Sequence, residues 1–171
     1  MKKEGLPRLL DGQERFPFVV VSPQLPRGRD WPPDALEAFV DLVLSRHPAD
    51  PERVSLAGIS SGALAALELA GRQPGRYAAV VAAPVPGVPA APCSVRAAVW
   101  LFHNRDDGRV PLRVSNRVSA ALRSCGVHVR QTVYPAGGHD CWSAAFASRS
   151  LYEWLSAMRR PGSLALPPRP S

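Results

Sequence analysis

The polar residues of this sequence could perform nucleophilic catalysis, because a serine, two aspartates and a histidine follow one another in a suitable order. A serine hydroxyl is a weak nucleophile at neutral pH. It needs a histidine to take its proton and a carboxylate to orient that histidine. Ser60 lies in the run Gly-Ile-Ser-Ser-Gly at 58–62, a spacing typical of a strained turn that holds a serine hydroxyl clear of a sheet. Ser61 would open the next helix, so its N–H would face a developing oxyanion.

The histidine must come from a loop that reaches this serine turn. Of the four histidines, His139 is the best candidate, because it follows an apolar run on a glycine-rich loop. His47 and His128 are expected on the surface. His103 ends another apolar run and could reach the site, but a buried histidine at a strand end is more often structural.

The acid is less clear from the residues alone. Asp106 and Asp107 are neighbours on one loop, and an Asp-Asp-Gly run also suits a turn without any catalytic role. Both aspartates therefore stay open at this point.

The elements that must hold these residues alternate along the chain. Apolar runs and helical patterns follow one another, which predicts an α/β fold with a mostly parallel sheet and helices on both faces. In such sheets the chemistry lies beyond the carboxyl ends of the strands, so the serine turn and the loops after His103 and Tyr134 should meet. The expected strands are 16–22, 54–59, 77–83, 97–103 and 127–134. Four helices are expected: one capped by Asp34, one after Ser60, one that starts at Pro111 and one after the loop of His139.

Composition limits the other functions. The 171 residues carry a net charge of +7, but the arginines are scattered without aromatic interleaving, so nucleic-acid binding is not expected. We find neither an apolar run of membrane-spanning length nor a signal peptide, and the compartment stays open. We expect one domain over 1–160 and a proline-rich disordered tail over 161–171.

The three cysteines give no sign of a metal site. Cys93, Cys125 and Cys141 lack ligand spacing, and the simplest expectation is that they are reduced, partly buried thiols. No metal or cofactor is implied by the sequence.

Five stretches of the chain resemble α/β-hydrolase esterases of the phospholipase/carboxylesterase and polyhydroxybutyrate-depolymerase-like group, often labelled predicted peptidases. They are GLPRLL, FPFVVVSPQLP, DPERVSLAGISSGA, VWLFHNRDDGRVP and YPAGGHDCWSAAF, and they span most of the chain from Gly5 to Leu155. The resemblance implies a serine hydrolase that cleaves small-molecule or polymeric carboxylic esters. By the family's motifs it assigns the nucleophile to Ser60, the acid to Asp107 and the base to His139.

The chain also departs from the family pattern. Ser61 and Ala63 replace a methionine and a glycine after the nucleophile, and Asn104 replaces a glycine after His103. Family members carry an upstream strand, central in the sheet, whose loop gives a second oxyanion donor, and the resemblance places the start of this chain after it. We therefore expect an N-terminally truncated α/β-hydrolase fold that could self-associate through exposed strand edges. The alternative is a catalytically impaired remnant or interaction module.

Overall fold

The sheet has four parallel strands in the order in which they occur along the chain. The structure is a computed structural model that describes residues 6–7, 10, 16–26 and 28–163. Its strands are β1 (Ser55–Ile59), β2 (Ala79–Ala83), β3 (Ala98–Asn104) and β4 (Val129–Tyr134). Ile59 is level with Ala83, and Asn104 with Tyr134, so the strands end at one edge of the sheet, as predicted.

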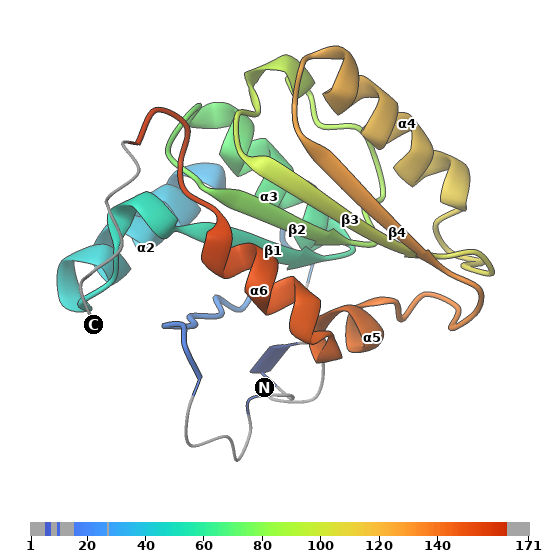
Figure 1. Cartoon of the computed structure of the whole chain (residues 1–171), viewed down its shortest axis with the longest axis horizontal. Coiled ribbons are helices and arrows are strands. Elements are labelled where there is room, and N and C mark those ends of the chain that lie inside the picture. The colour runs from blue at the N-terminus through green and yellow to red at the C-terminus, as the bar shows by residue number, and fades with distance from the viewer. Residues whose placement is uncertain (1–5, 8–9, 11–15, 27, 164–171) are drawn as a thin grey trace.

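Helices cover both faces of this sheet, which confirms the expected α/β class (Figure 1). α3 and α4 pack on one face, with α2 outside α3, while α5 and α6 pack on the other. The helices are α2 (Pro33–Arg46), α3 (Ser61–Arg72), α4 (Leu112–Ser124), α5 (Trp142–Ala147) and α6 (Arg149–Ala157), with short 3-10 turns η1 (Pro51–Arg53) and η2 (Pro92–Ser94).

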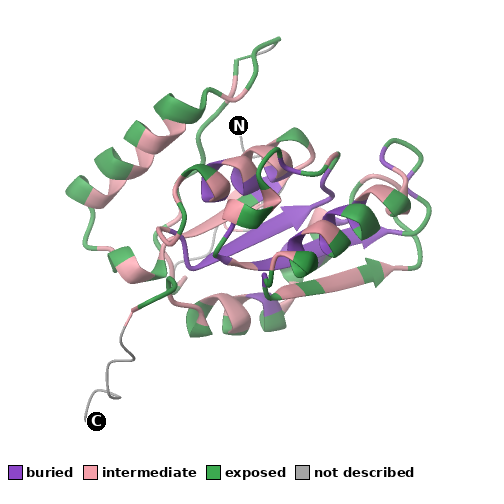
Figure 2. Ribbon diagram, turned by 90° about the horizontal axis from the view of Figure 1, so that it is seen from above, coloured by how far each residue is buried: buried purple, intermediate pink, exposed green. Residues whose placement is uncertain are grey.

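Apolar residues on the two central strands form the core. All five residues of β2 and six of the seven of β3 are buried, as a parallel sheet covered on both faces requires. α3 supplies Ala63, Ala66, Leu67 and Ala70 at helical spacing to one side of the sheet. Figure 2 shows the buried strands at the centre and the mostly exposed α2 at the periphery.

The segment 16–22 is not a strand, contrary to the sequence expectation. No residue in it is buried, and both Val19 and Val21 are exposed. It lies across a cavity of about 670 Å³ from β1, so the two backbones are not paired. Its β-branched composition suits a sheet, but a strand needs a neighbour to satisfy its backbone groups, and the described residues provide none here.

The expected state of the cysteines was also wrong. Cys93 in η2 and Cys125 at the end of α4 form a disulfide, with their Cα atoms 4.9 Å apart. The two residues are 32 positions apart, so their proximity depends on the packing of η2 against α4. Cys141 is free and buried, as expected for a structural thiol.

Two local expectations also differ. Pro32, not Asp34, is the N-cap of α2; Asp34 lies in the first turn and forms an ion pair with Arg72. The final helix is interrupted at Ser148, which separates α5 from α6. The disordered tail over 161–171 stays a prediction: residues 161–162 lie in a turn, and 164–171 lie outside the described residues. No helix within the described part is long and apolar enough to span a membrane.

Candidate active site

Ser60 has a strained backbone at the junction of β1 and α3. Its φ of 52° and ψ of −118° make it the only non-glycine residue with positive φ in the described part of the chain. Its N–H donates to the carbonyl of Ala83 at 3.3 Å, which ties the turn to the end of β2. Residues keep such conformations only where the surrounding structure enforces them, and they are concentrated at functional sites.

The two glycines that flank this turn have different roles. A Cβ on Gly58 would lie 2.1 Å from the carbonyl oxygen of Gly62, so only glycine fits there. A Cβ on Gly62 would meet only the Trp31 ring, at 3.8 Å, which is ordinary contact. Of these two positions, only 58 therefore requires a glycine for steric reasons.

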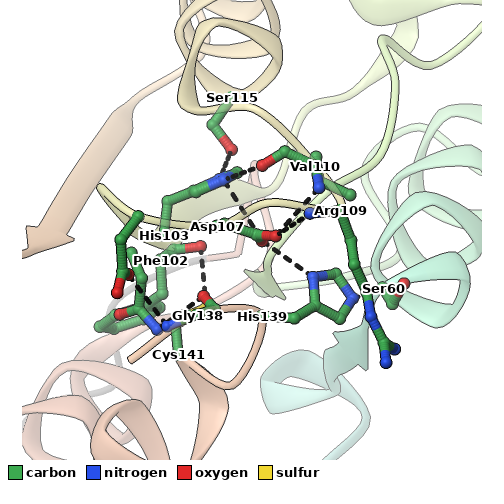
Figure 3. A network of polar contacts seen from close by, with 12 residues as sticks. Ser60, Phe102, His103, Asp107, Arg109, Val110, Ser115, Gly138, His139 and Cys141 are labelled. Carbon is green, nitrogen blue, oxygen red and sulfur yellow. Dashed lines mark hydrogen bonds and ion pairs between the residues drawn. The ribbon is translucent and has the colours of Figure 1, made fainter. Parts of the chain in front are cut away.

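A hydrogen-bonded chain connects Ser60 to a carboxylate through His139. The Ser60 hydroxyl lies 3.2 Å from Nε2 of His139, and Nδ1 of His139 lies 2.8 Å from Oδ2 of Asp107 (Figure 3). With the proton on Nδ1, the imidazole donates to the carboxylate and leaves Nε2 free to accept from the serine. The structure thus brings together the three residues selected by the resemblance, from the carboxyl ends of β1, β3 and β4.

Asp107 is held in a charged state by several donors. Its side chain is fully buried, and Oδ1 accepts the backbone N–H groups of Arg109 and Val110 at 2.8 and 2.9 Å. Burial by itself would raise the pKa of this carboxyl group. The hydrogen bonds from the Val110 amide and from His139 outweigh burial, so the pKa of Asp107 lies below its ordinary value.

His103 has the structural role that the sequence suggested. It is fully buried, and its Nε2 donates to the carbonyl of Val110 at 2.8 Å while Nδ1 accepts from the Ser115 hydroxyl at 2.5 Å (Figure 3). The same Nε2 lies 3.6 Å from Asp107. The ring thus fixes the loop 105–111 through Val110, and none of its hydrogen bonds goes to the serine turn.

Asp106 binds the backbone of the loop that carries His139, rather than the His139 ring. Its two carboxylate oxygens accept the N–H groups of Gly137 and Gly138 at 3.2 and 2.9 Å. Asn104, which replaces the glycine usual in the family, donates from Nδ2 to the carbonyl of Gly138 at 3.0 Å. Its side chain therefore helps to hold the same loop. Both glycines have positive φ, and a Cβ at Gly137 would lie 2.5 Å from Asn104.

The two residues after His139 make contacts that fix the chain on its C-terminal side. Asp140 accepts from the backbone N–H and the hydroxyl of Ser143 at 2.9 and 2.8 Å, which fixes the first turn of α5. Cys141 lies 3.3 Å from the carbonyl of Phe102, and burial raises its pKa to about 12, so it stays a protonated thiol at neutral pH. The sequence analysis missed the roles of Asn104, Ser115 and Asp140; the departure from the family pattern at Asn104 was the only signal for any of them.

Two further features belong to the surroundings of Ser60. Ser61 is the first residue of α3, and an amide in the first turn of a helix has no intrahelical acceptor. The described residues contain no cluster of three or more histidine, cysteine or acidic side chains that could hold a metal ion.

The parallel sheet, the strained serine turn and the loops at its carboxyl edge define the class: this is an α/β-hydrolase fold. Similar solved structures include a thermostable esterase at 24% identity and TM-score 0.66, SOBER1 of Arabidopsis thaliana at 19% and 0.62, and esterase PE8 at 27% and 0.58. The chain belongs to the phospholipase/carboxylesterase family, whose model matches residues 33–157.

The matches cover 74%, 72% and 70% of this chain in the order given. They cover only 36%, 61% and 59% of those proteins, so the chain spans less than two thirds of each. No curated protein sequence matches it.

Proposed function

We propose that this protein hydrolyses carboxylic esters through an acyl-enzyme intermediate formed on Ser60. The Ser60 oxygen attacks the ester carbonyl as His139 takes its proton at Nε2, and the carbonyl oxygen becomes an oxyanion. The C–O bond to the alcohol then breaks, and His139 returns the proton to the departing alkoxide. A water molecule, activated by the same histidine, splits the acyl-enzyme and regenerates the serine.

The hydrogen-bonded chain from Ser60 through His139 to Asp107 is the observation that carries this proposal. It supplies a base within 3.2 Å of the hydroxyl and a charged, buried carboxylate within 2.8 Å of the other ring nitrogen. The carboxylate fixes the tautomer and stabilises the imidazolium that forms during attack. Membership of the phospholipase/carboxylesterase family favours carboxylic esters as substrates.

Ser61 is the proposed source of one oxyanion donor. Its amide follows the nucleophile directly and lies at the positive end of α3, where a developing negative charge is stabilised. The hydroxyl of Ser61 has no part in this step.

The test compares two alanine substitutions on a short p-nitrophenyl ester. Ser60→Ala should reduce turnover to background, whereas Ser61→Ala should keep most of it, because alanine retains the backbone N–H. A fluorophosphonate probe should label the wild type and not Ser60→Ala, which reports on the nucleophile even when turnover is slow. Equal losses in the two variants would contradict the assignment.

A second candidate function, as an interaction module of the same fold, is favoured by the open edge of β1. All five residues of this strand line the cavity of about 670 Å³, and its central residue, Ala57, is exposed. Unpaired strand edges favour association with another chain. We propose that this edge pairs with a second copy of the chain, which is compatible with ester hydrolysis at Ser60.

A further inference from the structure

The loop between β4 and α5, residues 135–141, carries His139 but has little structure of its own. Gly137 and Gly138 have φ angles of 138° and 60°, and adjacent glycines leave a backbone many other conformations. Within the described part of the chain, no backbone–backbone hydrogen bond involves residues 135–138. This segment, which we call the histidine loop, must therefore be held by side chains from elsewhere.

Two side chains that lie just before the acid in the sequence hold the histidine loop. Asp106 accepts the N–H groups of Gly137 and Gly138 at 3.2 and 2.9 Å. Asn104 donates from Nδ2 to the carbonyl of Gly138 at 3.0 Å. Both polar backbone groups of Gly138, the residue directly before the base, are thus bound by side chains next to the acid.

Asn104 connects the acid and the base of the candidate site. It is the last residue of β3, is 1% exposed and lies level with Tyr134 of β4. Its carbonyl accepts the N–H of Asp107 at 3.3 Å, while its side chain holds Gly138. Because a strand residue is a more rigid support than a loop residue, Asn104 can fix one loop relative to the other. Asp106 is exposed and makes its bonds in competition with water, so we expect it to contribute less.

We propose that Asn104 is a positioning residue that holds His139 for proton transfer, an inference that rests on the proposed function. Through the backbone of Gly138, its amide keeps the ring 2.8 Å from Asp107 and 3.2 Å from Ser60. The glycine usual in the family has no side-chain donor, so this contact is a property of this sequence. Displacing a reacting group by about 1 Å can cost about 10²-fold in rate, which sets the upper limit of the expected effect.

Steady-state kinetics of Asn104→Ala tests the proposal. The substitution removes the amide without adding bulk, and it should lower kcat for p-nitrophenyl acetate by about 10- to 100-fold. KM should stay within about twofold of the wild-type value, because the buried Asn104 is not placed to touch a substrate and His139 acts in both acylation and deacylation. An unchanged kcat, or a loss found in KM alone, would overturn the proposal.

Asn116→Ala is the matched control for the kinetics. It makes the same chemical change on α4, where the Asn116 side chain accepts from Gln131 at 2.9 Å and makes no contact with the histidine loop. Its kcat should equal that of the wild type. A second variant, Asn104→Ser, keeps a polar group at the buried position but is too short to reach the carbonyl of Gly138, so it should reproduce the loss if Asn104→Ala does not fold.

Hydrogen exchange followed by mass spectrometry reports on the histidine loop without any substrate. In Asn104→Ala, the amides of residues 136–140 should exchange at least about fivefold faster than in the wild type, because the loop opens more often. Asn116→Ala should leave their exchange unchanged. Wild-type exchange in this loop after Asn104→Ala would overturn the proposal even if kcat fell.

A double-mutant cycle with His139→Ala separates positioning from a general structural role. p-Nitrophenolate departs without needing a proton, so the residual turnover of His139→Ala can be followed on this substrate. There, Asn104→Ala should lower the remaining kcat less than about twofold, since no ring is left to position. A loss by the same factor as in the wild type would show that Asn104 acts elsewhere, and would overturn the proposal. A failure of probe labelling at Ser60 would remove the proposed function, whereas the exchange experiment would still show whether Asn104 holds the loop.

Discussion

The half of the molecule built on β3 and β4 differs from the half built on β1 and α2 in how its buried polar groups are paired. Around β3, the buried side chains of His103, Asp107 and Ser115 all have hydrogen-bond partners. On the other half, Trp31 Nε1 and Tyr77 Oη are buried without any partner among the described residues.

The two halves also differ in packing. β3 is covered on both faces, with six of its seven residues buried, whereas β1 lines a cavity of about 670 Å³ along its whole length. The acid and the base of the candidate site thus lie in a preorganised network, while the serine is attached to the more open half. A buried polar network fixes geometry only when its members are satisfied, so we expect the two halves to respond differently to substitution.

The largest expected effect is on the acid in the well-paired half. Asp107→Asn should lower kcat by about 10⁴-fold, because an amide favours the wrong histidine tautomer and cannot stabilise the imidazolium. Because the pKa of Asp107 lies below its ordinary value, the carboxylate is charged from about pH 5 upward, and the loss should be seen across that whole range. Steady-state kinetics on a p-nitrophenyl ester measures it.

Asp106 provides the matched control for that substitution. Asp106→Asn keeps only one of the two oxygens that accept the N–H groups of Gly137 and Gly138, but Asp107 still orients His139, so the substitution should cost much less in kcat. The opposite ranking would transfer the orienting role to Asp106.

The disulfide contributes to the stability of the well-paired half without taking part in the site. Cys93 and Cys125 close a loop of 32 positions, which by loop-closure entropy stabilises the fold by about 3–4 kcal/mol. Cys93→Ala combined with Cys125→Ala should lower the free energy of unfolding in urea by that amount. The folded protein should keep its kcat, because η2 and the end of α4 precede the amino ends of β3 and β4.

Treatment of the wild type with a thiol reductant should reproduce the effect, since Cys141 is buried and free in either state. An unchanged urea midpoint after reduction would show that the crosslink adds no stability.

We expect the unpaired edge of β1 to cause self-association of the protein. We expect the purified chain to elute larger than its 18.4 kDa monomer, because an unpaired strand edge favours pairing with another copy. Ala57→Lys adds a charge in the middle of β1 and should shift the protein toward the monomer. Light scattering coupled to gel filtration measures the mass.

The opposite edge supplies the control. Val133 is an exposed residue of β4, the other edge strand, and Val133→Lys should leave the mass unchanged if association uses β1. A wild type that elutes as a monomer, or a shift caused equally by both lysines, would contradict association through β1.

The sequence predicted those parts of the molecule that depend on local patterns. Apolar runs and turn residues located all four strands, and a parallel sheet necessarily gathers Ser60, Asp107 and His139 at one edge. The prediction of a strand over 16–22 was wrong, because strand pairing depends on a neighbouring strand, which composition cannot show. The disulfide was missed because proximity across 32 positions arises from tertiary packing. Asn104 and Ser115 could not be assigned, since only the folded loops show what they contact.

The smallest expected effect compares the removal of one buried hydroxyl from each half. Ser115→Ala leaves Nδ1 of His103 without its donor, and an unsatisfied buried group costs about 1–3 kcal/mol in unfolding free energy. Tyr77→Phe removes a hydroxyl that has no hydrogen-bond partner among the described residues and whose pKa is raised by burial. Its loss should therefore leave the protein as stable or up to about 1 kcal/mol more stable, since the desolvation penalty disappears together with the group. Urea unfolding of both variants measures the difference. If Tyr77→Phe destabilised the fold as much as Ser115→Ala, the Tyr77 hydroxyl would have a partner, and the contrast between the two halves would not hold at this residue.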